Sequence, residues 1–269
     1  MDRLKETNYM KGFLPYALAA FLVGIVGGLS TVLGPAFMLD MNLAYNNTTW
    51  SALSQAISTA ACAPILGKLG DIFGRRKTLL LGILIYTLGS ILSALAASLI
   101  HLLIARFIVG IGTAAIAPTV MSYIVTEFPP EKIGKGFSIY MLISSAAVIF
   151  GPTLGALILG ASGWRALMWV SSAICVVFLS LCFITLPRQT FVIKPINNFD
   201  FTGAFFVIIF FSLLLCVPSF GQNFGWQTIP FLIVLSLSLI TLLLLVIAEK
   251  RAKNPISDLL WRERSLFYL

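Results

Sequence analysis

Residues 67–77 read GKLGDIFGRRK, a short basic stretch that separates two long apolar segments. The segment before it covers residues 48–66, and the segment after it covers residues 78–98. Each segment has about the 20 residues that an α-helix needs to cross the hydrocarbon core of a bilayer. The stretch is therefore predicted to be a loop between two membrane-spanning helices.

The composition of the whole chain indicates the same class of protein. Of the 269 residues, 59% are hydrophobic and only 10% are charged, and the mean hydropathy is +0.98. A soluble domain carries about 25% charged residues. The composition excludes a water-soluble enzyme, a disordered chain and a DNA-binding domain, and it predicts an all-α polytopic membrane protein.

About eight apolar stretches are long enough to be transmembrane helices. They cover residues 13–37, 48–66, 78–98, 102–125, 137–159, 166–186, 201–219 and 228–248. Arg106 is the only charged residue inside these stretches. A polar link that runs from Pro187 to Asp200 separates the sixth stretch from the seventh.

The basic residues indicate how the chain is oriented in the membrane. Sixteen of the 18 lysines and arginines lie before the first stretch, after the last, or in alternate loops. Cytoplasmic loops carry such an excess. We therefore expect a multi-pass protein of the cell membrane, plasma or inner, with a cytoplasmic N-terminus. The net charge of +8 then reflects this excess in the cytoplasmic loops, with some attraction to anionic lipids of the bilayer, and not nucleic-acid binding.

Motifs for enzymatic or metal chemistry are lacking in the sequence. There is no G-x-x-x-x-G-K-[ST] phosphate loop, no H-E-x-x-H, and no cysteine or histidine spacing typical of a metal site. The four cysteines all lie inside apolar stretches. We therefore expect no enzyme activity, no catalytic residue, no cofactor and no metal site.

The loop at 67–77 carries residue types with defined structural uses. Gly67 permits the close approach of another helix, and Gly74 permits a tight turn. Asp71 can face the positive N-terminus of a neighbouring helix. Arg75 and Arg76 can pair with a carboxylate or a lipid phosphate. A generic basic loop with turn glycines is the alternative interpretation.

This loop resembles the G-x-L-x-D-x-x-G-R-[RK] motif of the major facilitator superfamily. Residues 106–112, RFIVGIG, resemble the R-x-x-x-G-x-G motif of drug:proton antiporters. Residues 147–156, AVIFGPTLGA, resemble their G-x-x-x-G-P-x-x-G-G antiporter motif, with alanine at both outer glycine positions. GWR at 163–165 resembles a G-W-R-x-x-F element of the same proteins, and DFTG at 200–203 is similar to the start of an inserted helix pair in fourteen-helix exporters.

The resemblance implies a domain division and a missing part. Residues 1–190 would form a six-helix N-terminal transporter domain. Residues 191–269 would form two additional helices and the start of a further segment. The chain would then be the N-terminal portion of a fourteen-helix drug:proton antiporter, and its C-terminal half would be a missing partner.

Two of the matched motifs carry candidate transport residues. An arginine at membrane depth needs a polar partner or a water-filled cavity, and the resemblance implies that Arg106 takes part in proton coupling. Snorkelling of Arg106 to the outer interface is the alternative. We expect Pro152 to bend its helix, and we expect Gly151 and Gly155 to form a face for close packing. The resemblance adds a role in sealing the transporter against ion leak; ordinary bending and packing is the alternative.

Glu127, at the cytoplasmic end of the fourth stretch, is the last candidate. It could pair with Arg75 or Arg76 as part of an inner gate, or it could be a solvated loop acid. No aspartate or glutamate lies inside any of the eight stretches. Proton coupling is therefore implied by the resemblance, and the visible residues do not show which group carries the proton.

These observations predict a secondary active transporter that exports lipophilic or cationic drugs in exchange for protons by alternating access. Its partners would be a small-molecule substrate and the proton. A truncated or half-size membrane protein without transport of its own is one alternative. A solute uptake symporter is another, and the Gly-Pro motif at 151–152 disfavours it.

Overall fold

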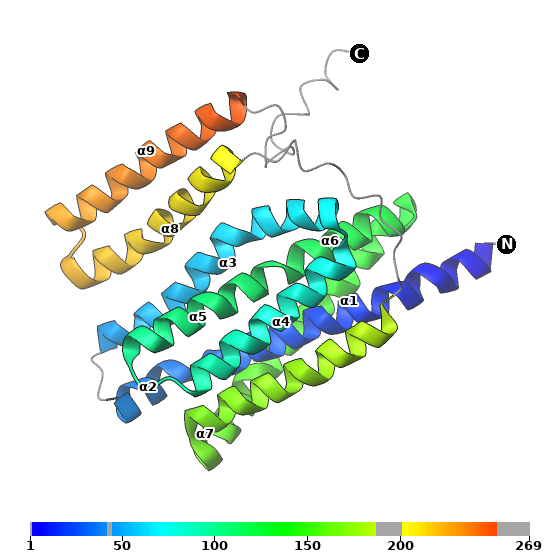
Figure 1. The fold of residues 1–269 in the computed structure, drawn as a ribbon, viewed down its shortest axis with the longest axis horizontal. Coiled ribbons are helices and arrows are strands. Elements are labelled where there is room, and N and C mark those ends of the chain that lie inside the picture. Colours follow the sequence, from blue (N-terminus) through cyan, green and yellow to red (C-terminus); the bar gives the residue numbers. More distant parts are fainter. Residues whose placement is uncertain (1, 42–44, 187–200, 252–269) are drawn as a thin grey trace.

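The computed structural model describes residues 2–41, 45–186 and 201–251, and helices dominate them (Figure 1). The α-helices are α1 (Asp2–Ser30), α2 (Leu33–Met41), α3 (Tyr45–Phe73), α4 (Arg75–Ala94), α5 (Leu99–Ala114), α6 (Ile116–Glu127), α7 (Ile133–Thr185), α8 (Phe201–Phe224) and α9 (Ile229–Arg251), with a 3-10 turn, η1, at Pro130–Lys132. No strand occurs in these ranges. The predicted all-α membrane fold is confirmed.

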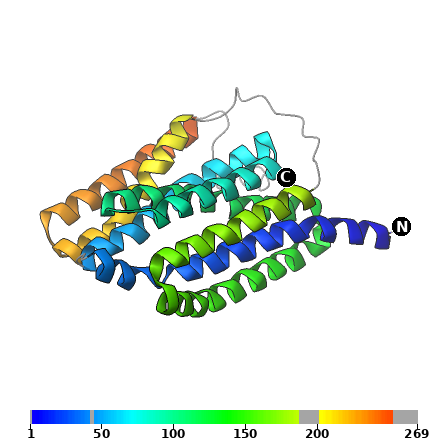
Figure 2. The same ribbon diagram turned by 60° about the horizontal axis from the view of Figure 1, so that its bottom comes forward.

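One helix, α7, contains two of the predicted spans. In the described ranges, seven helical segments are long and apolar enough to cross a membrane, and the α7 segment is the longest of them. The α7 backbone leaves helical geometry at Gly163, where φ is 78° and ψ is 176°. Figures 1 and 2 show α7 folded back on itself as a hairpin. Its two arms hold the spans predicted at 137–159 and 166–186, so all eight predicted spans are helical.

The span predicted at 13–37 is not one continuous helix. α1 ends at Ser30, and α2 begins at Leu33. Pro35 has no N–H to donate to the carbonyl of Thr31, so an unbroken helix would leave that carbonyl without a partner. The Thr31 N–H instead donates three residues back, to Gly28. The break gives residues 33–41 a direction of their own at one end of the bundle.

The span predicted at 102–125 is also divided in two. α5 ends at Ala114, and α6 begins at Ile116. Pro118 cannot donate to the carbonyl of Ala114, which repeats the arrangement at Pro35. The N–H of Ala115 donates three residues back, to Gly112, at 3.3 Å. α5 and α6 still follow one another as a single apolar span.

The bundle is organised around α1 and α7. α1 lies along the α7 hairpin, while α5 lies between α3 and α4 (Figures 1 and 2). α8 and α9 form an antiparallel pair outside α3 (Figure 1). The ring of Phe220 on α8 lies 6.1 Å from the ring of Trp50 on α3.

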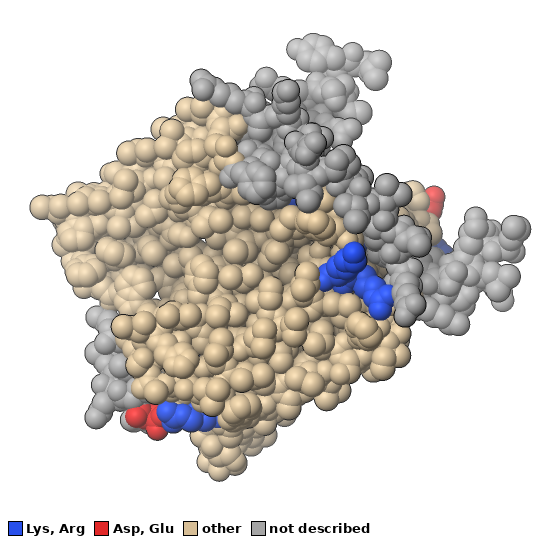
Figure 3. All heavy atoms as spheres, viewed as in Figure 1, with Lys and Arg blue, Asp and Glu red and all other residues tan. Residues whose placement is uncertain are grey.

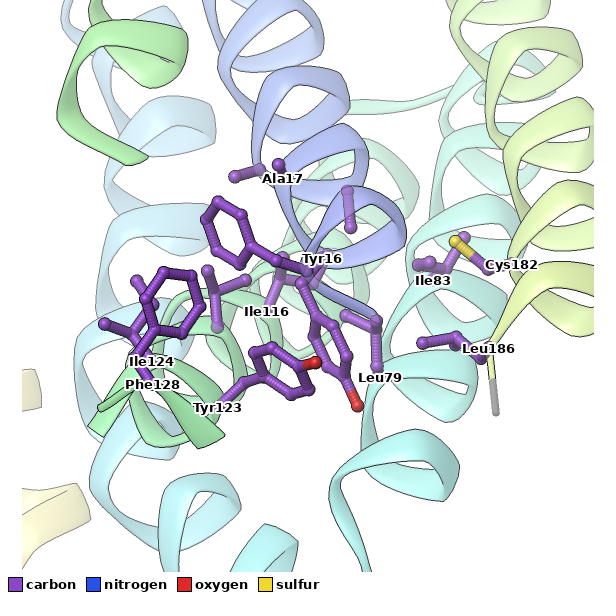
Figure 4. Close-up of a cluster of buried hydrophobic side chains, with 14 residues drawn as sticks. Tyr16, Ala17, Leu79, Ile83, Ile116, Tyr123, Ile124, Phe128, Cys182 and Leu186 are labelled. Carbon is purple, nitrogen blue, oxygen red and sulfur yellow. The ribbon is translucent and has the colours of Figure 1, made fainter. Parts of the chain in front are cut away.

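Two clusters of buried side chains hold the bundle together. The first, shown in Figure 4, joins α1, α4, α6 and α7, and in it the ring of Tyr16 stacks on Tyr123 at 4.3 Å. The second surrounds Phe37, Trp164 and Met168 near the bend of α7. Outside these clusters the surface is largely apolar, and Figure 3 shows charged atoms only toward the ends of the molecule. Such a surface suits a lipid environment.

The predicted domain division is not tested by this architecture. The boundary between residues 190 and 191 lies in the link 187–200, outside the described residues. The predicted start of a further segment, at 265–269, also lies outside them. The division into residues 1–190 and 191–269 therefore stays a prediction.

Candidate functional site

A cavity of about 860 Å³ opens among α1, α2, α3 and α5. Most of its lining is apolar, and Leu215 of α8 adds to one side. Its polar lining residues include Ser30, Thr31, Gln55, Thr59, Arg106 and Thr113. The predicted intramembrane arginine is therefore placed on the wall of a cavity and not at the outer surface.

Arg106 is 3% exposed, and uncharged groups surround it. Its Nη1 donates to Oε1 of Gln55 at 3.2 Å and to Oγ of Ser30 at 3.4 Å. Its Nη2 lies 3.4 Å from the sulfur of Met168, and its guanidinium lies 5.7 Å from the ring centre of Phe37. Its Nε has no hydrogen-bond partner among the described residues. Burying such a charge without a carboxylate partner is costly, which is typical of a functional group.

Packing between α3 and α5 holds Gln55 opposite Arg106. Ser54 donates to the carbonyl of Leu103 at 2.8 Å, and Thr59 donates to the carbonyl of Gly110 at 3.1 Å. A side chain at Gly110 would collide with α3. The glycine of the predicted motif thus allows the close approach that brings the two side chains together.

Two charged residues of the loop motif, Arg75 and Asp71, contact α6 at the other end of the bundle. Arg75 Nη1 lies 3.4 Å from Oε1 of Glu127, and the arginine side chain is 10% exposed while the glutamate is 45% exposed. Ser122 donates to Oδ1 of Asp71 at 2.9 Å. Of the two arginines proposed as partners of Glu127, the structure pairs it with Arg75.

The remaining loop residues have different partners. Gly74 precedes α4 with φ 100°, a backbone conformation that favours glycine. A Cβ at Gly67 would lie 3.1 Å from the ring of Pro118, so α3 packs closely on α6 there. Arg76 donates to the carbonyl of Phe183 at 2.9 Å and lies 5.7 Å from its ring centre. Arg76 therefore joins α4 to the last turns of α7.

The glycines of the predicted antiporter motif face α1. A Cβ at Gly151 would lie 2.6 Å from the Cα of Gly28, and a Cβ at Gly155 would lie 3.1 Å from the carbonyl oxygen of Leu29. Pro152 also lies against Gly28. The α7 backbone keeps helical dihedral angles at Pro152. These residues therefore form a face of close helix packing between α1 and α7.

Comparison with known proteins identifies the family. The sequence matches the profile of the Major Facilitator Superfamily over residues 16–248. The chain belongs to this superfamily. The resemblance inferred from the motifs is thereby confirmed, and the chain is a multi-pass membrane protein of a transporter family.

Named relatives in the superfamily include multidrug transporters. The chain is 28% identical to "Multidrug resistance protein Stp" of Mycobacterium tuberculosis over 92% of its own length and 46% of that protein. It is 27% identical to "Multidrug transporter protein MdtP" of Bacillus subtilis, over 92% of the chain and 43% of that protein. The chain thus spans about half the length of the curated relatives it matches.

Solved structures of superfamily members share the fold. One is a bacterial homologue of the human lysosomal transporter Spinster, in an inward-facing, unoccupied conformation. It aligns with a TM-score of 0.60 at 17% identity, over 89% of this chain and 60% of that one. At this identity the likeness supports the fold alone.

One polar cluster of this superfamily member was not predicted. Asp40, at the end of α2, accepts a hydrogen bond from Nε1 of Trp164 at 2.8 Å. Its carboxylate also forms an ion pair with Nη1 of Arg165 at 2.6 Å. These contacts hold the pKa of the Asp40 carboxyl below its usual range, with the hydrogen bond from Trp164 as the larger cause. Arg165 also lies 3.5 Å from the carbonyl of Ala96. The sequence predicted the GWR element only from its resemblance to a family motif. No sequence pattern indicated that Asp40 would be its acidic partner.

The Asp40 cluster connects to the cavity through Phe37. Phe37 lies one turn before Asp40 on α2, and its ring meets the ring of Trp164 edge to face at 5.0 Å. The same ring lies 5.7 Å from the guanidinium of Arg106. The broken first span therefore places one aromatic side chain, Phe37, between the Asp40–Arg165 ion pair and the buried Arg106.

Metal ligands are not grouped in the part of the chain that the structure describes. No three histidine, cysteine, aspartate or glutamate side chains come together there. His101 follows Ser98, whose side chain caps α5 by accepting from the His101 backbone N–H.

Proposed function

We propose that the chain forms the cavity-bearing part of a proton-coupled exporter of lipophilic or cationic drugs. Alternating access would come from rocking of this bundle against a second half. The observation that carries the proposal is the buried, charged Arg106 on the wall of a largely apolar cavity. The named multidrug relatives support the substrate class.

The lining of the cavity suits a lipophilic substrate. Small-molecule sites are mostly apolar and contain a few placed polar groups. Gln55, Thr59 and Thr113 supply such groups beside alanine and glycine surfaces. No acid lines the cavity among the described residues, so recognition of a cationic drug would require a carboxylate from the second half.

Arg106 would act on the proton through its charge. A guanidinium stays protonated in proteins, so Arg106 does not itself carry the proton. Its positive charge would favour proton release from an acid that approaches it when the two halves close. The neutral surroundings of Arg106 leave that charge uncompensated until such an acid arrives.

The other two motif sites would serve the conformational cycle. The close contact of Gly151 and Gly155 with α1 would keep ions from leaking between helices. The Arg75–Glu127 pair and the Asp71–Ser122 contact would set the inner end of the bundle for gating. In this proposal the inner end and the N-terminus face the cytoplasm across the plasma or inner membrane, as the loop charges indicate.

Everted membrane vesicles test this proposal. The vesicles would be prepared from cells that produce the native-length protein, and their interior would be made acidic. Ethidium would then be added to the outside medium. The proposal predicts proton-driven dye accumulation that a protonophore abolishes and that vesicles without the protein lack. In a second set of vesicles preloaded with ethidium, proton-driven release of the dye would support an uptake symporter. Transport equal to that of vesicles without the protein would support a protein without transport of its own.

A further inference from the structure

A second hollow lies on the outer surface, away from the cavity. It is a groove of about 660 Å³ between α4 and the second arm of α7. Its walls come from residues 77–84 of α4 and residues 179–184 of α7. The α4 positions 77, 80, 81 and 84 share one helical face, so the groove runs about 10 Å along the helix.

The walls of the groove are apolar and open to the surroundings. The side chains of Leu81 and Ile184 are 56% and 80% exposed. Ser180 is small and lies among larger side chains, which leaves space between the helices. Its hydroxyl donates to the carbonyl of Val176 in the same helix at 3.0 Å, so it requires no other partner. An apolar chain can occupy this space without stranding a polar group.

One end of the groove is positively charged. Lys77 is exposed there and forms no hydrogen bond or ion pair within the described part of the chain. Arg76 is fixed beside it by the carbonyl and ring of Phe183, which uses one of the five N–H donors of the guanidinium. No acid lines the groove among the described residues. Figure 3 shows basic side chains gathered where α4 begins and α7 ends.

We propose that this groove binds an anionic phospholipid. The phosphate would lie on Lys77 and Arg76, and one acyl chain would lie between α4 and α7. The two cations and the adjoining apolar walls match the two ends of such a molecule. The proposal rests on the predicted orientation, because the cytoplasmic leaflet is where anionic lipids attract basic side chains.

The lipid would bridge two helices that already pack against each other, since Ser90 of α4 donates to the carbonyl of Met168 of α7 at 3.2 Å. Arg76 already links the start of α4 to the carbonyl of Phe183 near the end of α7. A phosphate on the same guanidinium would strengthen that link without any change in protein contacts. The preceding residue, Arg75, pairs with Glu127, so the lipid would bind beside the proposed inner gate.

Lipid titration followed by native mass spectrometry tests the proposal on the purified, native-length protein. The probes are phosphatidylglycerol and, as the zwitterionic comparison, phosphatidylcholine. Loss of one basic contact predicts about five-fold weaker phosphatidylglycerol binding in Lys77→Gln, with phosphatidylcholine unaffected. Ser180→Trp, which fills the groove and keeps both cations, is expected to weaken phosphatidylglycerol binding as well.

Lys135→Gln is the matched control, because Lys135 is exposed near the same end of the bundle but does not line the groove. The control is expected to bind phosphatidylglycerol as the unmodified protein does. An equal loss in Lys135→Gln and Lys77→Gln, or unchanged binding in Ser180→Trp, would overturn the proposal. The experiment measures lipid binding, so its result supports or contradicts the lipid site independently of whether the protein transports drugs.

Discussion

Gly28 of α1 and Gly151 of α7 meet backbone to backbone. A Cβ at Gly151 would lie 2.6 Å from the Cα of Gly28, and a Cβ at Gly28 would lie 2.8 Å from the Cα of Gly151. Both atoms in conflict belong to the backbone, so neither helix can relieve the contact by rotating a side chain. The contact between α1 and α7 therefore depends on glycine at both positions.

Gly151→Ala is expected to lower the stability of the bundle. The added methyl group must push α1 and α7 apart, and overpacking of this kind costs about 1–3 kcal/mol. The matched control is Gly160→Ala on the same helix, since a Cβ at Gly160 meets nothing within 4 Å. Thermal unfolding in detergent should show a lower midpoint for Gly151→Ala only. Equal midpoints would argue against close packing.

Gln55→Glu is expected to abolish transport while the protein still folds. The new carboxylate would lie beside Nη1 of Arg106, where the Gln55 oxygen now lies at 3.2 Å, and it would neutralise the guanidinium. The charge would then no longer act on an incoming acid. Dye flux should fall more than ten-fold at equal protein level. Ser236→Ala, at an exposed position of α9 that does not line the cavity, should leave flux within about two-fold. Unchanged flux in Gln55→Glu would rule out the electrostatic role.

The Asp40 cluster predicts a dependence of stability on acid pH. The pKa of the Asp40 carboxyl is lower in the folded state than in the unfolded state. The ionised carboxylate therefore stabilises the fold above the ordinary aspartate pKa of about 3.9, and this contribution is lost as the pH falls through the lowered pKa. The unfolding midpoint should therefore decrease below about pH 4. Asp40→Asn should be less stable near pH 6 and should lose this part of the pH dependence. A variant with the same acid profile as the unmodified protein would contradict the assignment.

The Arg75–Glu127 pair predicts an interaction energy that a double-mutant cycle can measure. The glutamate is nearly half exposed, so the coupling between Arg75→Gln and Glu127→Gln should be below about 1 kcal/mol. A second cycle that combines Arg75→Gln with Glu131→Gln serves as the comparison. Glu131 is an exposed acid without an ion-pair partner in the described residues, so this cycle should show no coupling. A coupling of zero would mean that the pair does not contribute to the stability of the inner end.

The sequence predicts the local features of this structure well. The eight apolar stretches all form helices, because span length and hydropathy depend on neighbouring residues only. The two helix breaks were not predicted. Each lies three or four residues before a proline, at Pro35 and at Pro118, which is the local signal that could have located them.

The partners of the site residues were harder to predict. Arg106 was expected to need a polar partner, but Gln55 lies 51 residues away in the chain and has no distinguishing neighbourhood. Asp40 and Trp164 are 124 residues apart, and only the folded bundle brings them together. For Glu127, motif and charge left two arginines and a solvated state open, and only the folded structure shows the pair with Arg75.

The most direct test of the central claim is proton-driven ethidium accumulation by Arg106→Ala in everted vesicles, at membrane protein levels matched to the unmodified protein. The proposal places the buried charge of Arg106 at the centre of coupling, so accumulation should fall to the level of vesicles without the protein. Undiminished, protonophore-sensitive accumulation in Arg106→Ala would contradict it.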